Sequence, residues 1–380
     1  METPFIFGKL VSGADFTNRT GEIIRLKNNF CAGINTVMIS PRRWGKSSLV
    51  EKATREIKAE NQKIKIVSID LFNVRAEEDF YRILTEQVIR GTTTKLKEIL
   101  AFTRDFFKQW IPKISFSPDH VQEFSLGLNW DDVKKQPGEI LDLPQKIAKS
   151  KGWKIIICID EFQNIGFYSD TLAFQKQLRS HWQQQPDVSY CLFGSKRHML
   201  MEVFTSPSMP FYKFGDLLFL EKIGTEDWER YITGRFLATG KEIDPEQSCR
   251  IAALADNHPY YVQQLAQLCW LRCDKKLTDE VIDQALDSLT MQLSLLFQNL
   301  TESLSTTQVN YLEALINKET HFSSKEAIVK YRLGTSANVS RIKKALIDKE
   351  IIDTDKEAGV FIDPIYKFWL KQYYFATRNP

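Results

Sequence analysis

The chain has 380 residues, of which 43% are hydrophobic, 12% aromatic and 26% charged. This composition excludes a disordered or fibrous protein, and the length predicts two to three domains. The formal net charge is only +3, so the chain is not basic throughout, and any surface for nucleic acid must be local.

Several features predict a cytoplasmic protein. The N-terminus lacks the basic and then apolar segments of a secretory signal. The longest apolar runs, such as Ile155–Ile159, are far shorter than the ~20 residues of a membrane helix. The six cysteines, at positions 31, 158, 191, 249, 269 and 273, form no CxxC pair. We therefore expect reduced cysteines in the core and no cysteine-based metal site.

The first half of the chain alternates strand-like and helix-like segments. Apolar strands are expected at five places: Asn35–Ser40, Lys63–Asp70, Trp153–Asp160, Val188–Gly194 and Asp216–Leu220. Helical patterns lie between them, which predicts an α/β fold with a five-stranded parallel sheet. Between Thr92 and Asp142 this rhythm fails. There Ile114–Leu128 alternates with a period of two, which predicts a β-hairpin insertion over about 92–142.

The second half is mainly helical. Periodicity from Gly224 to about Leu300 predicts a four-helix lid, and three short helices followed by strands predict an α+β winged-helix domain. We therefore expect domains at 1–222, 223–300 and 301–380. In the third helix of the last domain, four side chains should face outward: Asn338, Ser340, Arg341 and Lys344. Residues 302–380 hold 12 Lys and Arg against 10 Asp and Glu, so DNA contact and protein contact both stay open.

One loop has the pattern of a phosphate site. The strand Asn35–Ile39 leads through Ser40, Pro41, Arg42, Arg43, Trp44 and Gly45 into a helix that begins with Lys46, Ser47 and Ser48. Backbone N–H groups of this loop and helix would face a polyphosphate, Lys46 would neutralise it, and Ser47 would hold Mg²⁺. The full pattern has Gly where Ser40 stands, and a bare Gly-Lys-Ser is a weak signal. The alternative is an ordinary helix start with Lys46 in solvent.

Two acids favour the phosphate site over that alternative. The buried strand ends in Asp160 and Glu161, and the carboxyl ends of parallel strands meet at one edge of a sheet. Asp160 should therefore lie beside Ser47 and support Mg²⁺, while Glu161 should orient and polarise an attacking water. These are the groups that hydrolysis of ATP to ADP needs. After the next strand, Ser195 either senses the γ-phosphate or caps the helix that follows.

Together these residues resemble the prokaryotic archaeal-type ATPase family, a branch of the AAA+/STAND P-loop NTPases related to origin-recognition initiators. Four segments carry the resemblance: Phe16–Glu22, Ser40–Leu49, Asn257–Tyr261 and Asp363–Trp369. The resemblance implies a P-loop NTPase core, a lid and a winged helix. It also implies that the segment around Arg19 lies against the adenine and that Pro259 touches the nucleotide. Relatives carry arginine where this chain has Lys213, the place of an arginine finger, and lysine cannot make its planar, two-pronged contact.

Three functions stay open. The favoured one is an ATPase that couples its nucleotide state to a DNA or protein partner. The second is a slow STAND-type switch between ADP and ATP forms, and the third is a DNA-binding adaptor whose nucleotide is structural. A kinase fits less well, because no acceptor-site motif is present. An oligomer is compatible with the sequence: Arg42 and Arg43 either serve a neighbouring copy's site or pair with surface acids.

Overall fold

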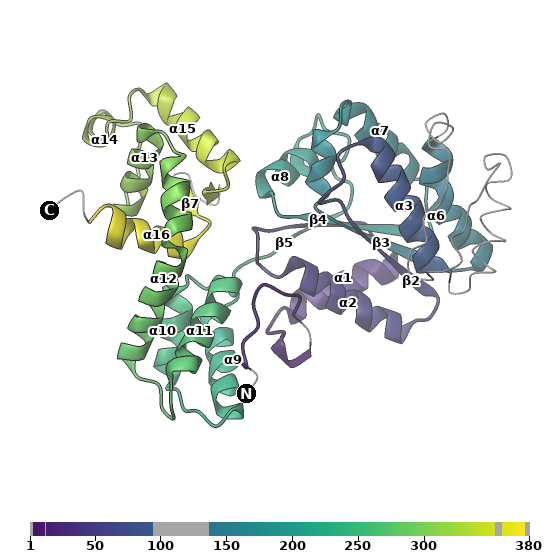
Figure 1. Cartoon of the computed structure of the whole chain (residues 1–380). Coiled ribbons are helices and arrows are strands. Elements are labelled where there is room, and N and C mark those ends of the chain that lie inside the picture. The colour runs from purple at the N-terminus through teal and green to yellow at the C-terminus, as the bar shows by residue number, and fades with distance from the viewer. Residues whose placement is uncertain (1–2, 12, 94–136, 354–358, 377–380) are drawn as a thin grey trace, which may run out of the picture. The chain divides into compact units, whose positions relative to one another are not determined.

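The structure is a computed structural model that describes residues 3–11, 13–93, 137–353 and 359–376 (Figure 1). The chain divides into two compact units. The sheet unit comprises residues 19–42 and 46–220, and the helical unit comprises residues 1–18, 43–45 and 221–380. Among the described residues, no helix combines the length and the apolar character needed to cross a membrane.

The sheet unit contains the expected five-stranded parallel sheet. Its strands are β1 (Thr36–Ile39), β2 (Ile64–Asp70), β3 (Lys154–Asp160), β4 (Val188–Gly194) and β5 (Asp216–Phe219). Their order across the sheet is β2-β3-β4-β1-β5, and every pairing is parallel. The α/β fold class is therefore confirmed. The order also places β4 between β1 and β3, so the loop after β4 lies between the loops that follow β1 and β3.

Helices cover both faces of this sheet. In Figure 1, α1 (Thr20–Ala32) and α2 (Lys46–Glu60) lie on one face, and α3 (Glu77–Thr92), α6 (Pro137–Lys151) and α7 (Thr171–Trp182) lie on the other. A shorter helix, α8 (Arg197–Thr205), follows β4. Because both faces are covered, Ile155–Ile159 of β3 is buried at every position, as its continuous apolar sequence requires.

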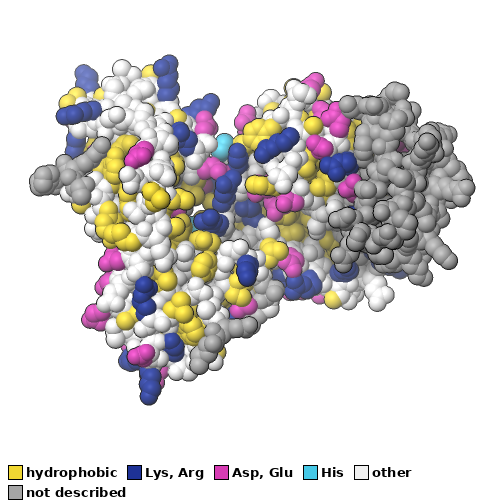
Figure 2. Space-filling model, viewed as in Figure 1, with side chains coloured by type: hydrophobic (Ala, Val, Ile, Leu, Met, Phe, Trp, Pro, Cys, Tyr) yellow, Lys and Arg dark blue, Asp and Glu magenta, His cyan; other side chains and the backbone are white. Residues whose placement is uncertain are grey.

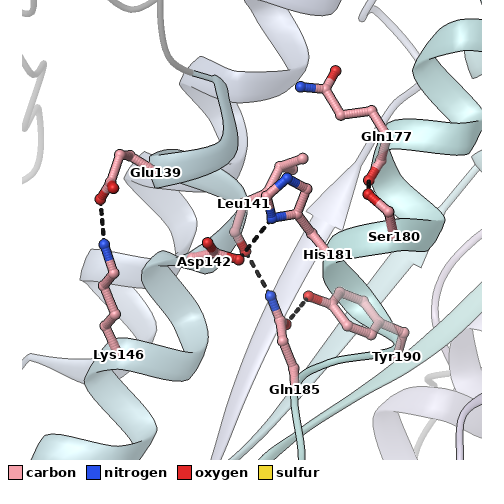
Figure 3. Close-up of polar contacts among 9 residues, drawn as sticks. All are labelled: Glu139, Leu141, Asp142, Lys146, Gln177, Ser180, His181, Gln185 and Tyr190. Atoms are coloured by element: carbon pink, nitrogen blue, oxygen red, sulfur yellow. Dashed lines mark hydrogen bonds and ion pairs between the residues drawn. The ribbon is translucent and has the colours of Figure 1, made fainter.

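Polar contacts join α6 to α7 and the strand after it (Figure 3). His181 Nδ1 lies 2.8 Å from Asp142 Oδ1, and Gln185 Nε2 donates to the carbonyl of Leu141 at 2.8 Å. The buried Tyr190 hydroxyl donates to Gln185 Oε1 at 2.6 Å. Helix α6 corrects part of one expectation, because the end of the predicted hairpin insertion, residues 137–142, is helical. The rest of that insertion, residues 94–136, lies outside the described residues.

The helical unit begins with four helices and continues into a winged helix. The four helices are α9 (Thr225–Ala238), α10 (Pro245–Leu254), α11 (Pro259–Arg272) and α12 (Asp279–Glu302). The winged helix contains α13 (Thr306–Ile316), α14 (Lys325–Lys330), α15 (Ser336–Asp348), the hairpin β6 (Ile352–Asp353) and β7 (Val360–Phe361), and α16 (Pro364–Trp369) with a final turn at Leu370–Tyr374. The expected boundary near residue 300 falls inside α12. The division into three domains remains a prediction.

The four helices and the winged helix share one hydrophobic core. Buried side chains run from Trp228 and Leu265 in the four helices to Leu312 and Leu346 in the winged helix without a break. Two hydrogen bonds tie α12 to α16: Thr301 Oγ1 lies 2.8 Å from the Tyr366 hydroxyl, and Trp369 Nε1 donates to Ser294 Oγ at 3.0 Å. The winged helix is therefore packed onto α12 through both apolar and polar contacts.

Candidate functional site

The loop between β1 and α2 bends as a phosphate-binding loop does. Gly45 has a φ of 86°, in the left-handed region that favours glycine, and Arg43 also has a positive φ, of 62°. Lys46 is the first residue of α2, and its side chain is buried. Its Nζ donates to the carbonyls of Pro41 at 3.0 Å and Ser40 at 3.4 Å. A lysine ammonium thus lies at the positive end of a helix, a combination that favours an anion.

The end of β3 approaches the start of α2. Ser47 Oγ donates to Asp160 Oδ2 at 2.8 Å, and the N–H of Glu161 donates to Asp160 Oδ1 at 2.8 Å. Burial raises the pKa of the Asp160 carboxyl, and these two hydrogen bonds partly offset that effect. A hydroxyl and a half-buried carboxylate are oxygen ligands of the type that Mg²⁺ takes, alongside water and phosphate. Ser47 and Asp160 therefore fit the predicted metal.

Glu161 is held by neighbours on two sides. Its backbone is left-handed, with a φ of 52°, and its Oε2 accepts from Ser195 Oγ at 3.0 Å and from Gln163 Nε2. Ser195 Oγ in turn accepts from Arg42 Nε at 3.2 Å. The strand order explains this chain of contacts, because Ser195 follows β4, which separates the strand of the loop from the strand of Glu161. Ser195 does not cap α8, whose N-cap is Lys196 without a side-chain hydrogen bond.

Arg19 is a buried cation at the start of α1. Only 5% of the residue is exposed, and its backbone is left-handed with a φ of 71°. Its Nη1 pairs with Glu22 Oε1 at 2.9 Å, whereas its Nη2 has no hydrogen-bond partner among the described residues. A buried donor without a partner is uncommon and indicates space for an acceptor. Ser48, also predicted to bind the nucleotide, is buried in the first turn of α2.

The middle of the loop belongs to the helical unit. The Arg43 guanidinium lies 4.3 Å from the ring centre of Tyr260, and the Trp44 ring lies 6.3 Å from that of His258. Pro259 is the first residue of α11. The Tyr261 hydroxyl donates to Asp363 Oδ2, and Asp363 Oδ1 accepts the N–H groups of the first turn of α16 at 2.9 Å. The motif that begins α11 is therefore bonded to the one that begins α16.

The remaining predicted positions, Lys213 and four residues of α15, are exposed with the exception of Asn338. Lys213 is exposed, and its ammonium lies 5.3 Å from the Tyr212 ring. On α15, Ser340, Arg341 and Lys344 are exposed as expected. Asn338 is not, because its Nδ2 donates to the carbonyl of Leu333 at 2.8 Å. Figure 2 shows Lys and Arg side chains at separate places on the face of the winged helix in view, with acidic side chains among them.

Gln163 was not predicted as a site residue. It lies in the short 3-10 helix Phe162–Phe167 after β3, and only 1% of it is exposed. The signal in the sequence is slight: two adjacent amides, Gln163 and Asn164, in a segment whose other residues are apolar or glycine. Its contact with Glu161 depends on how that turn is folded, which periodicity does not reveal.

Known proteins share this fold. Residues 295–372 match the family model of a probable winged helix domain. A Walker-type ATPase of Pyrococcus abyssi superposes with a TM-score of 0.65 and 16% identity, over 94% of this chain and 96% of that one. The Aeropyrum pernix ORC2 protein in its ADP form superposes with a TM-score of 0.55 and 14% identity, over 99% of this chain and 98% of that one. The ORC1 protein from the same organism, in complex with DNA, superposes with a TM-score of 0.51 and 14% identity over the whole of both chains. No curated protein matches the chain by sequence.

These similarities confirm the fold that the resemblance to the archaeal-type ATPases implies. They include both the α/β core and the C-terminal winged helix. At identities of 14–16% they concern the fold alone.

Proposed function

We propose that this chain is a member of the archaeal-type ATPase family and hydrolyses ATP with Mg²⁺, coupling its nucleotide state to a DNA or protein partner. The observation that carries the proposal is a cluster of polar side chains at the carboxyl edge of the sheet. There Ser47 Oγ lies 2.8 Å from Asp160 Oδ2, and Ser195 Oγ lies 3.0 Å from Glu161 Oε2. One carboxylate is thus available to a metal and the other to a nucleophile, as phosphoryl transfer to water requires.

The chain's own groups would divide the reaction between them. Lys46 and the N–H groups at the start of α2 bind the phosphates, and Glu161 orients a water and accepts its proton. Ser195, whose hydroxyl contacts Glu161 and Arg42, would hydrogen-bond to the γ-phosphate. Mg²⁺, when bound by Ser47 and Asp160, supplies neutralisation of phosphate charge. Arg19 Nη2, which has no partner within the part of the chain that the structure describes, supports the proposed contact with the nucleotide base. The proposed contact of Pro259 with the nucleotide rests on the resemblance.

The test is release of phosphate from ATP in the presence of Mg²⁺. Glu161→Gln should lower kcat by about 100-fold or more, because it removes the group that accepts the proton. ADP affinity should stay within twofold of the original. The matched control is Glu246→Gln, an exposed glutamate in the first turn of α10. Equal rates for the original protein and Glu161→Gln would show that the assignment of Glu161 is wrong.

A slow nucleotide switch is the second candidate, favoured by the exposed lysine at position 213 in place of an arginine. Phosphate release measured over a wide range of protein concentration separates the two candidates. A specific rate that rises with concentration indicates an oligomer whose subunits complete each other's sites. A negligible rate at every concentration, with ADP retained, supports the switch. Identical protease protection in ADP and in an ATP analogue would exclude it.

The winged helix is the element through which a DNA or protein partner would bind. Winged helices bind DNA or protein, and the charge of this one is nearly balanced. Fluorescence anisotropy with a DNA duplex at low salt tests the DNA alternative, and an Arg341→Ala, Lys344→Ala double variant should weaken binding if α15 enters the major groove. An absence of affinity at low salt, in both ADP and an ATP analogue, favours a protein partner. The cytoplasmic location expected from the sequence stays a prediction.

A further inference from the structure

Gln163 makes a contact to which the proposed mechanism assigns no role. Its Nε2 donates to Glu161 Oε2, the same oxygen that accepts from Ser195 Oγ at 3.0 Å. A carboxylate only accepts hydrogen bonds, so the NH₂ end of the amide must be the end that faces Glu161. Two donors on one oxygen fix the direction of the carboxylate, and we expect the other oxygen, Oε1, to be the one that accepts from a water.

The other end of the amide is placed by a glycine. A Cβ atom at Gly194 would lie 1.8 Å from Gln163 Oε1 and 3.0 Å from its Cδ. The last residue of β4 must therefore lack a side chain if Gln163 is to stay where it is. Gln163 Oε1 accepts no hydrogen bond from any described residue, so the position is set by space and by the bond to Glu161.

The residues on either side of Gln163 are anchored. Phe162 is fully buried, and its ring centre lies 5.7 Å from that of Phe204 and 5.5 Å from that of Phe211. Asn164 Nδ2 donates to the carbonyl of Leu71 at 2.9 Å. A side chain that is 1% exposed and held between two anchored neighbours has no second place to go. Gln163 is therefore suited to holding Glu161 in one orientation and unsuited to switching.

We propose that Gln163 is a positioning residue, which fixes the Glu161 carboxylate so that its Oε1 receives the proton of the attacking water. This inference rests on the proposed ATPase function. It assigns different roles to the two donors of Glu161. Ser195 also accepts from Arg42 at 3.2 Å and so connects Glu161 to the loop, whereas Gln163 contacts Glu161 from the turn that follows it.

The first experiment compares Gln163→Met with the original protein in the phosphate-release assay. Methionine fills similar space but donates no hydrogen bond, so kcat should fall by about 10- to 100-fold, as misplacement of a catalytic group does. KM and the Kd for ADP should stay within twofold, which separates loss of positioning from a damaged nucleotide site. The control is Gln175→Met, since Gln175 is fully buried on α7 and its amide has no partner among the described residues. It should keep the original kcat.

A second variant displaces the Gln163 side chain by a substitution at a neighbouring residue. Gly194→Ala places a methyl group where Gln163 Oε1 lies and should lower kcat about as much as Gln163→Met. Adding Gln163→Ala to Gly194→Ala should lower kcat no further than Gln163→Ala alone, because both changes act through one contact. The inference would be contradicted if the double variant lost kcat by the product of the two single losses. It would also be contradicted if Gln163→Met folded and kept the original kcat. If the original protein releases no phosphate, the proposed function and this inference are both wrong.

Discussion

Replacing His258 with glutamine should make the stability of the helical unit less dependent on pH between about 6.5 and 4. His258 is 5% exposed and directly precedes α11. Burial lowers the pKa of its imidazole from the ordinary 6.5 to about 4, and the nearby charges of Arg43 and Lys222 lower it further, whereas Asp256 acts in the opposite direction. Its ring lies 5.1 Å from that of Tyr261, so little water reaches it.

The stability falls as the pH falls because the unfolded chain takes up the proton at a higher pH than the folded chain. As the pH falls through 6.5, His258 becomes protonated in the unfolded chain, but in the folded chain it stays neutral until about pH 4. The unfolded state binds more protons in this interval, so acidification costs stability, and below pH 4 no further loss occurs. The interval of 6.5 − 4 pH units, at about 1.4 kcal/mol each, gives a loss of about 3 kcal/mol.

The assay has two parts. Thermal midpoints are measured between pH 7 and 4 for the original protein and for His258→Gln, with His321→Gln, an exposed histidine of the same unit, as control. Over that range the midpoint of the original protein and of the control should fall by several degrees more than that of His258→Gln. NMR titration of the imidazole signals then gives the pKa directly, because only five histidines are present. A pKa near 6.5 for His258 in the folded protein would refute the reasoning.

Three further changes test contacts that hold the fold. Asp363→Ala removes the N-cap of α16 and the acceptor for Tyr261, so the free energy of unfolding in urea should fall by about 1–3 kcal/mol, and an unchanged value would contradict the contact. Ile157→Ala leaves a cavity in the centre of β3 and should cost about 2–5 kcal/mol, seen as a lower thermal midpoint. Lys241→Met removes the ammonium that donates to the Trp270 carbonyl at 2.6 Å near the end of α11. About 1 kcal/mol should be lost, measured in urea, and equal stability would show that the bond contributes nothing.

The sheet could be predicted because its signals are local. Each strand is a short apolar run between turn residues, and a strand buried on both faces, such as Ile155–Ile159, is apolar at every position. The approach of Ser47 to Asp160 follows from a rule of topology, that parallel strands end at one edge, and the structure places the two side chains 2.8 Å apart.

The contacts of Glu161 required information that no single segment holds. The position of β4 between β1 and β3 brings Ser195 and Gly194 beside Glu161. The order of strands in a sheet cannot be predicted from the sequence of a single strand. Gln163 depends on the missing side chain of Gly194, 31 residues later in the sequence. Helix α6 was missed for a different reason: it begins at a proline and contains Pro144, a residue that normally interrupts a helical pattern.

Helix α12 has a mechanical consequence. Its 24 residues form one rigid rod about 36 Å long, whose first part packs with α11 and whose second part carries α16. A tilt of α9–α11 about any axis is therefore transmitted to the winged helix without a hinge to absorb it. The orientation of the winged helix relative to α9–α11 depends on the number of residues in α12. One residue inserted in the middle of α12 would turn the winged helix by about 100° and shift it by about 1.5 Å. Such an insertion would break the hydrogen bond from Tyr261 to Asp363 and disrupt the core that the four helices share with the winged helix.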